Sequence, residues 1–111
     1  GWGARCIIRM PGPEVDVLTW ATGEWLPLHV AAASQALLSA LTDVELDEYL
    51  SQIGGDRPPS DGELAAIRER AHQDRDRGWS VNAAELTPGV SSLGAVVRDS
   101  RGAAVCAISI K

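Results

Sequence analysis

The stretch LGAVVRDSRGAAVCAISIK, residues 93–111, decides the fold. Two runs of apolar and small residues, 93–98 and 103–111, flank the turn-forming residues Asp99-Ser100-Arg101-Gly102. This arrangement is typical of a β-hairpin. Because side chains alternate across a strand, the second run has two faces: Cys106, Ile108 and Ile110 on one, and Val105, Ala107, Ser109 and Lys111 on the other. The C-terminal part of the chain therefore predicts an antiparallel sheet.

The middle of the chain carries three helical patterns. Residues 30–41 are rich in alanine and leucine, which both have high helix propensity. Thr42 and Ser60 each stand three residues before a glutamate, the arrangement of a capping box, so each predicts the start of a helix. We expect helices over residues 30–41, 43–53 and about 61–77, with Gly78 ending the last one.

Three further strands complete the expected order of elements. Residues 5–10 and 15–20 are separated by Pro11-Gly12-Pro13, and they predict two strands that pair or lie near each other. Residues 79–82 predict a short strand after the last helix. Helices and strands are thus segregated along the chain, which favours an α+β fold with an antiparallel sheet over a parallel α/β sheet.

Length and composition indicate one globular domain. The chain has 111 residues, with 45% hydrophobic and 23% charged residues, so extensive disorder is excluded. Its net charge of -5 repels phosphate on average, so we expect no direct binding to nucleic acid. No apolar run approaches the roughly 20 residues of a membrane span. The chain begins at Gly1 and ends just after an apolar run, and we expect it to be a piece of a longer protein.

No catalytic or metal-binding motif is present in the sequence. Cys6 and Cys106 lie in apolar runs and are expected to be buried free thiols, which favours a reducing, cytoplasmic compartment. Together with His29 and His72 they lack metal-ligand spacing, so we expect neither a metal nor a cofactor. His29 is expected to make local hydrogen bonds. His72 and the charge run Glu69–Arg77 are expected to form a solvated helix face.

Two small polar features remain. Residues 29–34, HVAAAS, would present the N–H groups of a helix start with little side-chain bulk, which suits a carboxylate. The alanines would equally allow close packing of the helix on a sheet. Ser109 and Lys111 share a strand face, and Asn82 and Ser92 lie near the ends of neighbouring strands. These side chains form either the polar end of a small pocket or simply the solvent-exposed face of the sheet.

Several segments together resemble one family. Residues 23–38, GEWLPLHVAAASQALL, resemble the pattern G-x-x-L-P-L-H-A-T-A-x-G-K-A-L-L. Residues 77–85, RGWSVNAAE, are similar to R-G-Y-A-x-D-x-E-E, and residues 88–99, PGVSSLGAVVRD, to P-G-V-x-C-I-A-A-P-V-x-D. Residues 107–110, AISI, match A-L-S-V. These patterns are typical of the effector-binding domain of IclR-type transcriptional regulators, and the likeness runs from about Cys6 to Ile110.

The resemblance implies a fold, a function and partners. Residues 1–111 would form one effector-binding domain, a GAF- or profilin-like sensor with a curved antiparallel sheet packed by helices. Such domains bind a small organic acid or aromatic compound, act as homodimers or homotetramers, and are not enzymes. They control how strongly a winged helix-turn-helix domain binds DNA, and we expect that domain to be absent from these 111 residues. No membrane partner is implied.

The resemblance also implies the effector-binding residues, which carry over to Ala32, Ala33, Asn82, Val90, Ser92 and Ser109. Asn82 replaces the aspartate of the pattern, and Lys111 stands where the family often has serine, so a more negative effector would be favoured. Ser34 replaces a glycine. Two other functions stay open: a ligand-free oligomerisation module, and a small hydrolase that uses Ser34 or a cysteine.

Overall fold

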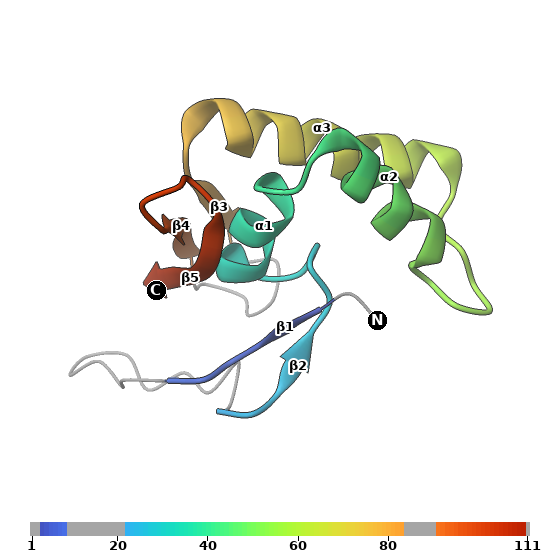
Figure 1. Cartoon of the computed structure of the whole chain (residues 1–111). Helices are drawn as coiled ribbons and strands as arrows, with labels where there is room; N and C mark the ends of the chain where they lie inside the picture. Colours follow the sequence, from blue (N-terminus) through green and yellow to red (C-terminus); the bar gives the residue numbers. More distant parts are fainter. Residues whose placement is uncertain (1–2, 9–21, 84–90, 111) are drawn as a thin grey trace.

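The structure, a computed structural model, describes residues 3–8, 22–83 and 91–110. Its elements follow the order β1 (Ala4–Arg5), β2 (Trp25–Leu26), α1 (Ala32–Ser39), α2 (Asp43–Gln52), α3 (Asp61–Arg77), β3 (Ser80–Ala83), β4 (Ser91–Arg98) and β5 (Ala104–Ile110). Helix α1 contacts the sheet strands and also α3, which crosses it on the other side (Figure 1). The expected α+β class with antiparallel pairing is confirmed.

The three C-terminal strands form one antiparallel sheet in the order β3-β4-β5. The turn between β4 and β5 has the chemistry expected from its sequence. The Asp99 carboxylate accepts hydrogen bonds from the N–H groups of Arg101 and Ala103 at 2.8 and 3.0 Å. Gly102 adopts φ 85°, a conformation that glycine reaches without a Cβ penalty. The predicted hairpin is therefore confirmed.

The ends of α2 and α3 are fixed by local hydrogen bonds. Thr42 Oγ1 accepts from the N–H of Glu45 at 3.2 Å, and Glu45 Oε1 accepts from the N–H of Thr42 at 3.0 Å. Ser60 Oγ accepts from the N–H of Glu63 at 3.2 Å. Helix α3 ends at Gly78, whose φ is 90° and whose N–H donates to the Asp74 carbonyl at 2.8 Å. Both predicted helix starts, and the glycine end of α3, are confirmed.

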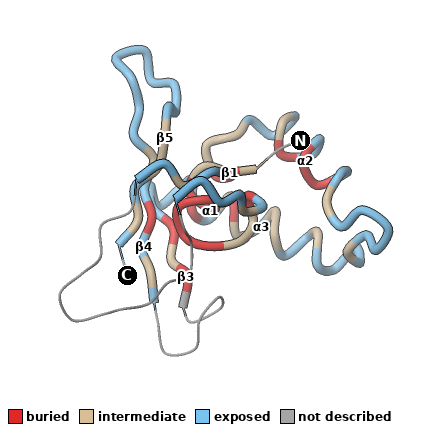
Figure 2. Tube along the Cα trace, turned by 90° about the horizontal axis from the view of Figure 1, so that it is seen from below, coloured by how far each residue is buried: buried red, intermediate tan, exposed pale blue. Residues whose placement is uncertain are grey.

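Most of the core surrounds α1 and one face of α2 (Figure 2). Helix α1 is buried on nearly all sides, because it lies between the sheet and α3. It is shorter than the predicted 30–41, since Ala31 has φ 70° and cannot belong to the helix. The main hydrophobic cluster joins α1, α2, α3 and the β1–β2 ribbon through Ala4, Leu28, Leu38, Leu46, Tyr49, Leu50 and Ala71.

The N-terminal ribbon differs from the expected pairing. Strand β1 pairs with β2, so that Ala4 lies opposite Leu26 and Arg5 opposite Trp25. Cys6 then exchanges backbone hydrogen bonds with Glu24 and Gly23 at 3.1 and 2.6 Å, just beside the turn at residues 22–23. The predicted strand 5–10 is therefore wrong over residues 6–8, and the expected partner 15–20 lies outside the described residues.

The charge run on α3 is not simply a solvated face. Asp74 is only 1% exposed and forms an ion pair with Arg77. Arg75 donates to the carbonyls of Ser39 and Leu41 at 3.1 and 2.8 Å, and to the Asp43 carboxylate at 2.9 Å. These contacts arise because the C-terminal half of α3 packs across the end of α1. The prediction of a solvated face was therefore wrong for Asp74, whereas Arg75 and Arg77 are exposed as predicted while they make these contacts.

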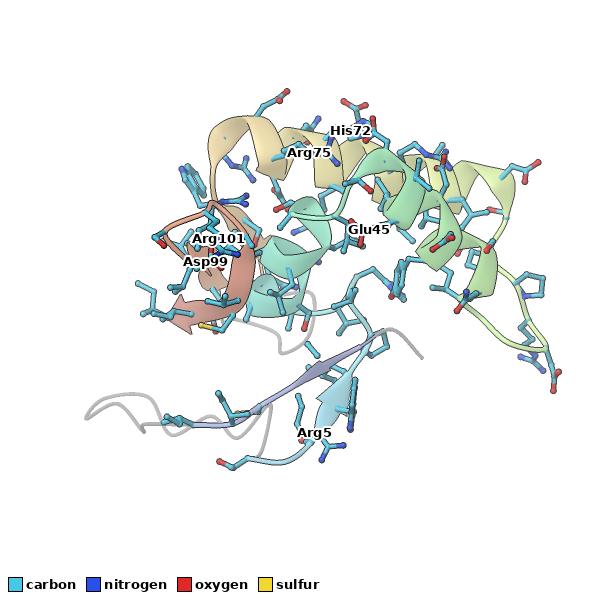
Figure 3. All side chains as sticks on the ribbon, viewed as in Figure 1. Arg5, Glu45, His72, Arg75, Asp99 and Arg101 are labelled. Carbon is cyan, nitrogen blue, oxygen red and sulfur yellow. The ribbon has the colours of Figure 1, made fainter. Side chains whose placement is uncertain are left out.

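Other single-residue expectations change less. His72, expected in solvent, lies beside Arg75 on α3 (Figure 3) and places Nε2 3.2 Å from Asp43 Oδ1. Cys6 and Cys106 are free thiols but are half-buried rather than buried. No helix within the described ranges has both the length and the apolar character needed to cross a membrane.

Candidate functional site

The start of α1 is built differently from the starts of the other two helices. Ala31 is the N-cap residue, with φ 70° and ψ 152°, and it offers no side-chain cap. The first turn of α1 contains no acidic residue, whereas α2 and α3 each have a hydroxyl cap and two acidic residues there. The positive end of the α1 dipole therefore has no charged side chain of its own helix to balance it.

The same helix start rests directly on strand β4. A Cβ atom at Gly94 would lie 2.5 Å from the carbonyl carbon of Ala32 and 2.9 Å from the amide nitrogen of Ala33, and closer still to the Ala32 oxygen. From strand β3, Ser80 Oγ donates to that same oxygen at 2.6 Å. The alternative interpretation of the alanines, close packing of helix on sheet, is therefore confirmed for Ala32.

The register of the sheet brings the predicted polar residues to the face that α1 covers. Ser80, Gly94 and Ser109 lie opposite one another on three neighbouring strands, and α1 begins above this row. Asn82 and Ser92 form the next row on the same face. Asn82 is buried, whereas Ser92 and Ser109 are half-buried.

We call Ala32, Ala33, Asn82, Ser92 and Ser109 the helix-start site. The structure thus places these predicted residues on, or directly above, one face of the sheet. Val90, the remaining predicted residue, lies outside the described residues. Lys111 does as well.

Ser34 is a further polar residue in the first turn of α1, which the sequence marked as a departure from the family pattern and as the nucleophile of the alternative hydrolase function. It is 0% exposed, and its Oγ has no hydrogen-bond partner within the described part of the chain. It lies in the first turn of α1, where the Cα–Cβ bond tilts toward the N-terminus of the helix. A buried hydroxyl without a partner costs about 1–3 kcal/mol, so this position favours a group that would bond to it.

His29 makes the local hydrogen bonds expected of it. Its Nδ1 lies 2.6 Å from Tyr49 Oη, and its carbonyl accepts from Gln35 Nε2 at 3.0 Å. Burial lowers the pKa of His29 below its ordinary value of 6.5. Burial also raises the pKa of Tyr49, although hydrogen bonds from the backbone of His29 and Leu28 oppose that rise. Both side chains are therefore neutral at pH 7.

The lowered pKa of His29 predicts a loss of stability in mild acid. The unfolded chain binds more protons than the folded chain once the pH falls below about 6.5, so the unfolding free energy falls from there toward the folded-state pKa. In His29→Gln, we expect a flatter dependence between about pH 7.5 and pH 5. Thermal unfolding across this range measures both profiles, and parallel slopes in the two proteins would contradict the assignment.

Three cavities are formed by described residues away from the helix-start site. One of about 400 Å³ lies between the ribbon and the end of α2, beside Trp25 and Tyr49. One of about 240 Å³ lies between α1 and α3, beside Gln35. A groove of about 450 Å³ follows α3 beside Val81. No sequence pattern indicated the first two cavities, because each is lined by segments far apart along the chain.

The described residues, 3–8, 22–83 and 91–110, do not form a cluster of metal-binding side chains. No group of three or more His, Cys, Asp or Glu side chains there is placed to hold an ion. What the helix-start site offers instead is a set of uncharged groups: the N–H groups of a helix start, two serine hydroxyls and one amide. Such groups bind and orient a small polar molecule.

Comparisons with known proteins agree on one family. A family model described as the bacterial transcriptional regulator IclR C-terminal domain matches residues 4–111. The chain is 33% identical over 108 residues to the HTH-type transcriptional repressor AllR of Salmonella paratyphi A (strain ATCC 9150 / SARB42), covering 96% of this chain and 37% of that protein. It is 31% identical to AllR of Escherichia coli (strain K12), with the same coverage. The chain thus spans little more than a third of these relatives.

Solved structures show the same fold. The repressor BlcR of Agobacterium tumefaciens superimposes with a TM-score of 0.68 at 31% identity, covering 82% of this chain and 38% of that one. The transcriptional regulator YaiJ superimposes with a TM-score of 0.81 at 21% identity, covering 96% and 62%. These similar proteins are regulators of transcription and not enzymes, as the sequence predicted.

Proposed function

Since the chain belongs to the family of C-terminal domains of IclR-type bacterial transcriptional regulators, we propose that it senses a small organic acid for such a regulator. A winged-helix domain elsewhere in the protein would bind DNA, so the regulator would act in the cytoplasm. Binding would change transcription only if the acid had different affinities for two arrangements of the protein. We further propose that the regulator is a homodimer or homotetramer.

The observation that carries this proposal is the alignment of the uncapped α1 start with the polar sheet face. The N–H groups of Ala32 and Ala33 belong to a first turn that has no acidic side chain. Asn82 and Ser92 form the row of the sheet next to the one on which α1 rests. A carboxylate above that row would accept hydrogen bonds from the helix start and from the serine hydroxyls.

The chemistry of the site favours an anion with a small body. Ser34 adds a buried hydroxyl in the first turn of α1, and no described residue accepts its proton. The helix-start site contains no carboxylate that would repel an acid. Val90 would form an apolar wall, as the family resemblance implies. An aromatic acid such as benzoate would use that wall, whereas a short aliphatic acid would use mainly the polar groups.

The test is a calorimetric titration of the 111-residue chain with short aliphatic carboxylates and with benzoate. For an acid that binds, Ser92→Ala and Ser109→Ala should each weaken affinity about tenfold or more, since a hydrogen bond to a charged group contributes about 1.5–3 kcal/mol. Ser100→Ala, in the exposed β4–β5 turn, removes the same hydroxyl from a site without ligand contacts and should change nothing. Equal affinities for all four proteins would refute the site.

A second candidate function rests on the opposite face of the sheet. Leu93, Val97, Ile108 and Ile110 are 45%, 37%, 62% and 66% exposed there. Exposed apolar faces of this kind often mark protein interfaces. If no carboxylate binds and sedimentation shows an oligomer that Ile108→Lys dissociates, the chain is a ligand-free oligomerisation module.

A further inference from the structure

The cavity of about 240 Å³ between α1 and α3 has the features of a second ligand site. Leu38 of α1 and Ile67 and Ala71 of α3 form its apolar walls. His29 and Gln35 line it as polar groups. Its volume exceeds that of a protein cavity of about 150 Å³ known to hold benzene, so a single six-membered ring fits.

The hydrogen bond between Tyr49 and His29 fixes which proton His29 offers. A phenol hydroxyl is a stronger hydrogen-bond donor than a neutral imidazole N–H, and an imidazole nitrogen is a stronger acceptor than a phenol oxygen. We therefore assign the Tyr49 hydroxyl as the donor to Nδ1 of His29, 2.6 Å away. A neutral imidazole whose Nδ1 accepts must carry its proton on Nε2. No further hydrogen bond joins the His29 ring to the described residues, so Nε2–H is an available donor.

Gln35 provides the complementary acceptor. Its Nε2 donates to the His29 carbonyl at 3.0 Å, which orients the side-chain amide. Gln35 is only 4% exposed, and its Oε1 is buried without a hydrogen-bond partner among the described residues. A buried carbonyl oxygen that lacks a donor is costly, so a ligand that supplies one gains affinity.

The charged residues of the cavity indicate an uncharged ligand. Arg70 and Asp74 line it as well, one positive and one negative, and His29 is neutral at pH 7. A charged ligand would meet one unfavourable partner and would lose its hydration on entry. A neutral hydroxyl both accepts and donates, so it matches the donor of His29 and the acceptor of Gln35.

From this geometry we infer that the α1–α3 cavity binds a small neutral alcohol or phenol. The hydroxyl accepts from His29 Nε2–H and donates to Gln35 Oε1, while the ring packs against Leu38, Ile67 and Ala71. This site is separate from the helix-start site and stands without the proposed function. Ser109→Ala should therefore leave phenol binding unchanged.

Phenol and toluene are the probes, because the two rings have the same shape and only phenol carries a hydroxyl. Titration followed by amide chemical shifts should show phenol bound about tenfold or more tightly than toluene, with shifts in α1 and α3. In Gln35→Met the preference should fall below about threefold, since the acceptor is lost. Gln73→Met, the same change on the exposed face of α3 outside the cavity, should keep it.

A second pair of variants does not disturb the core. Ala65 and Ala66 are both exposed on α3, but only Ala66 lines the cavity. Ala66→Phe should lower phenol affinity about tenfold by filling the entrance, and Ala65→Phe should not. The inference is overturned if phenol does not bind, if toluene binds equally well, or if Ala65→Phe and Ala66→Phe act alike.

Discussion

Gly94→Ala should lower the unfolding free energy by about 3 kcal/mol, a large effect for the addition of one methyl group. The new Cβ would overlap the Ala32 carbonyl group and approach the Ala33 nitrogen to 2.9 Å. These are main-chain atoms of α1, so they cannot rotate away as a flexible side chain would. The helix start must move outward, which also weakens the hydrogen bond from Ser80 to Ala32.

Chemical denaturation of Gly94→Ala and of a glycine control measures this effect. Gly62 lies in the first turn of α3, and the nearest atom to a Cβ there is Ser60 Oγ at 3.9 Å. Gly62→Ala should therefore stabilise the protein by about 0.5–1 kcal/mol, from helix propensity alone. Equal stability of Gly94→Ala and the parent would mean that α1 does not rest on β4. The family pattern has alanine at the position of Gly94. In proteins that follow the pattern, we expect the helix start to lie farther from the sheet.

Leu46→Ala should lower the unfolding free energy by about 2–5 kcal/mol. Leu46 is 1% exposed and belongs to the cluster in which α2 meets Leu28 and Leu38. Truncation removes buried methyl groups and leaves a cavity, because the surrounding helices are held by their own caps and relax only partly.

Val44 provides the matched control on the same helix. It is 72% exposed, so Val44→Ala should change stability by less than about 0.5 kcal/mol. Urea denaturation of both variants, with unchanged m-values, would show that the native state alone is affected. Similar losses in the two variants would contradict the placement of α2.

The helices could be predicted from the sequence because their signals are local. Thr42 and Glu45 bond to each other across three residues, and Gly78 adopts the left-handed conformation that the absence of a Cβ atom permits. The β4–β5 turn is just as local, since Asp99 bonds to the backbone two and four residues later. Such interactions join residues that are close together along the chain, so a single sequence is enough to predict them.

Contacts between distant segments could not be predicted in the same way. Strand β2 has only two residues and exists because it pairs with β1, about twenty positions earlier. Asp74 reads as a surface charge within its run, and only the packing of α3 buries it. Gly94 gives no sign that a helix start lies above it, because a glycine in a strand is compatible with many environments.

The candidate site was predictable in part for the same reason. Strand alternation alone separated Ser109 from Ile108, and the sheet register confirms that division. The pairing of Asn82 with Ser92 could not be derived from alternation, because it depends on how two strands slide past each other. The α1–α3 cavity depends on three segments at once and was missed.

The start of α1 is held to the sheet through its main chain, at Gly94 and Ser80, rather than through its side chains. Mutational drift along residues 31–33 would therefore leave the helix in position as long as the substituted residues stay small. If the helix-start site binds the effector as proposed, the strand residues of that site would then determine which effector is bound. Libraries that diversify positions 82, 92 and 109 on an unchanged helix would offer an economical route to biosensors for new metabolites.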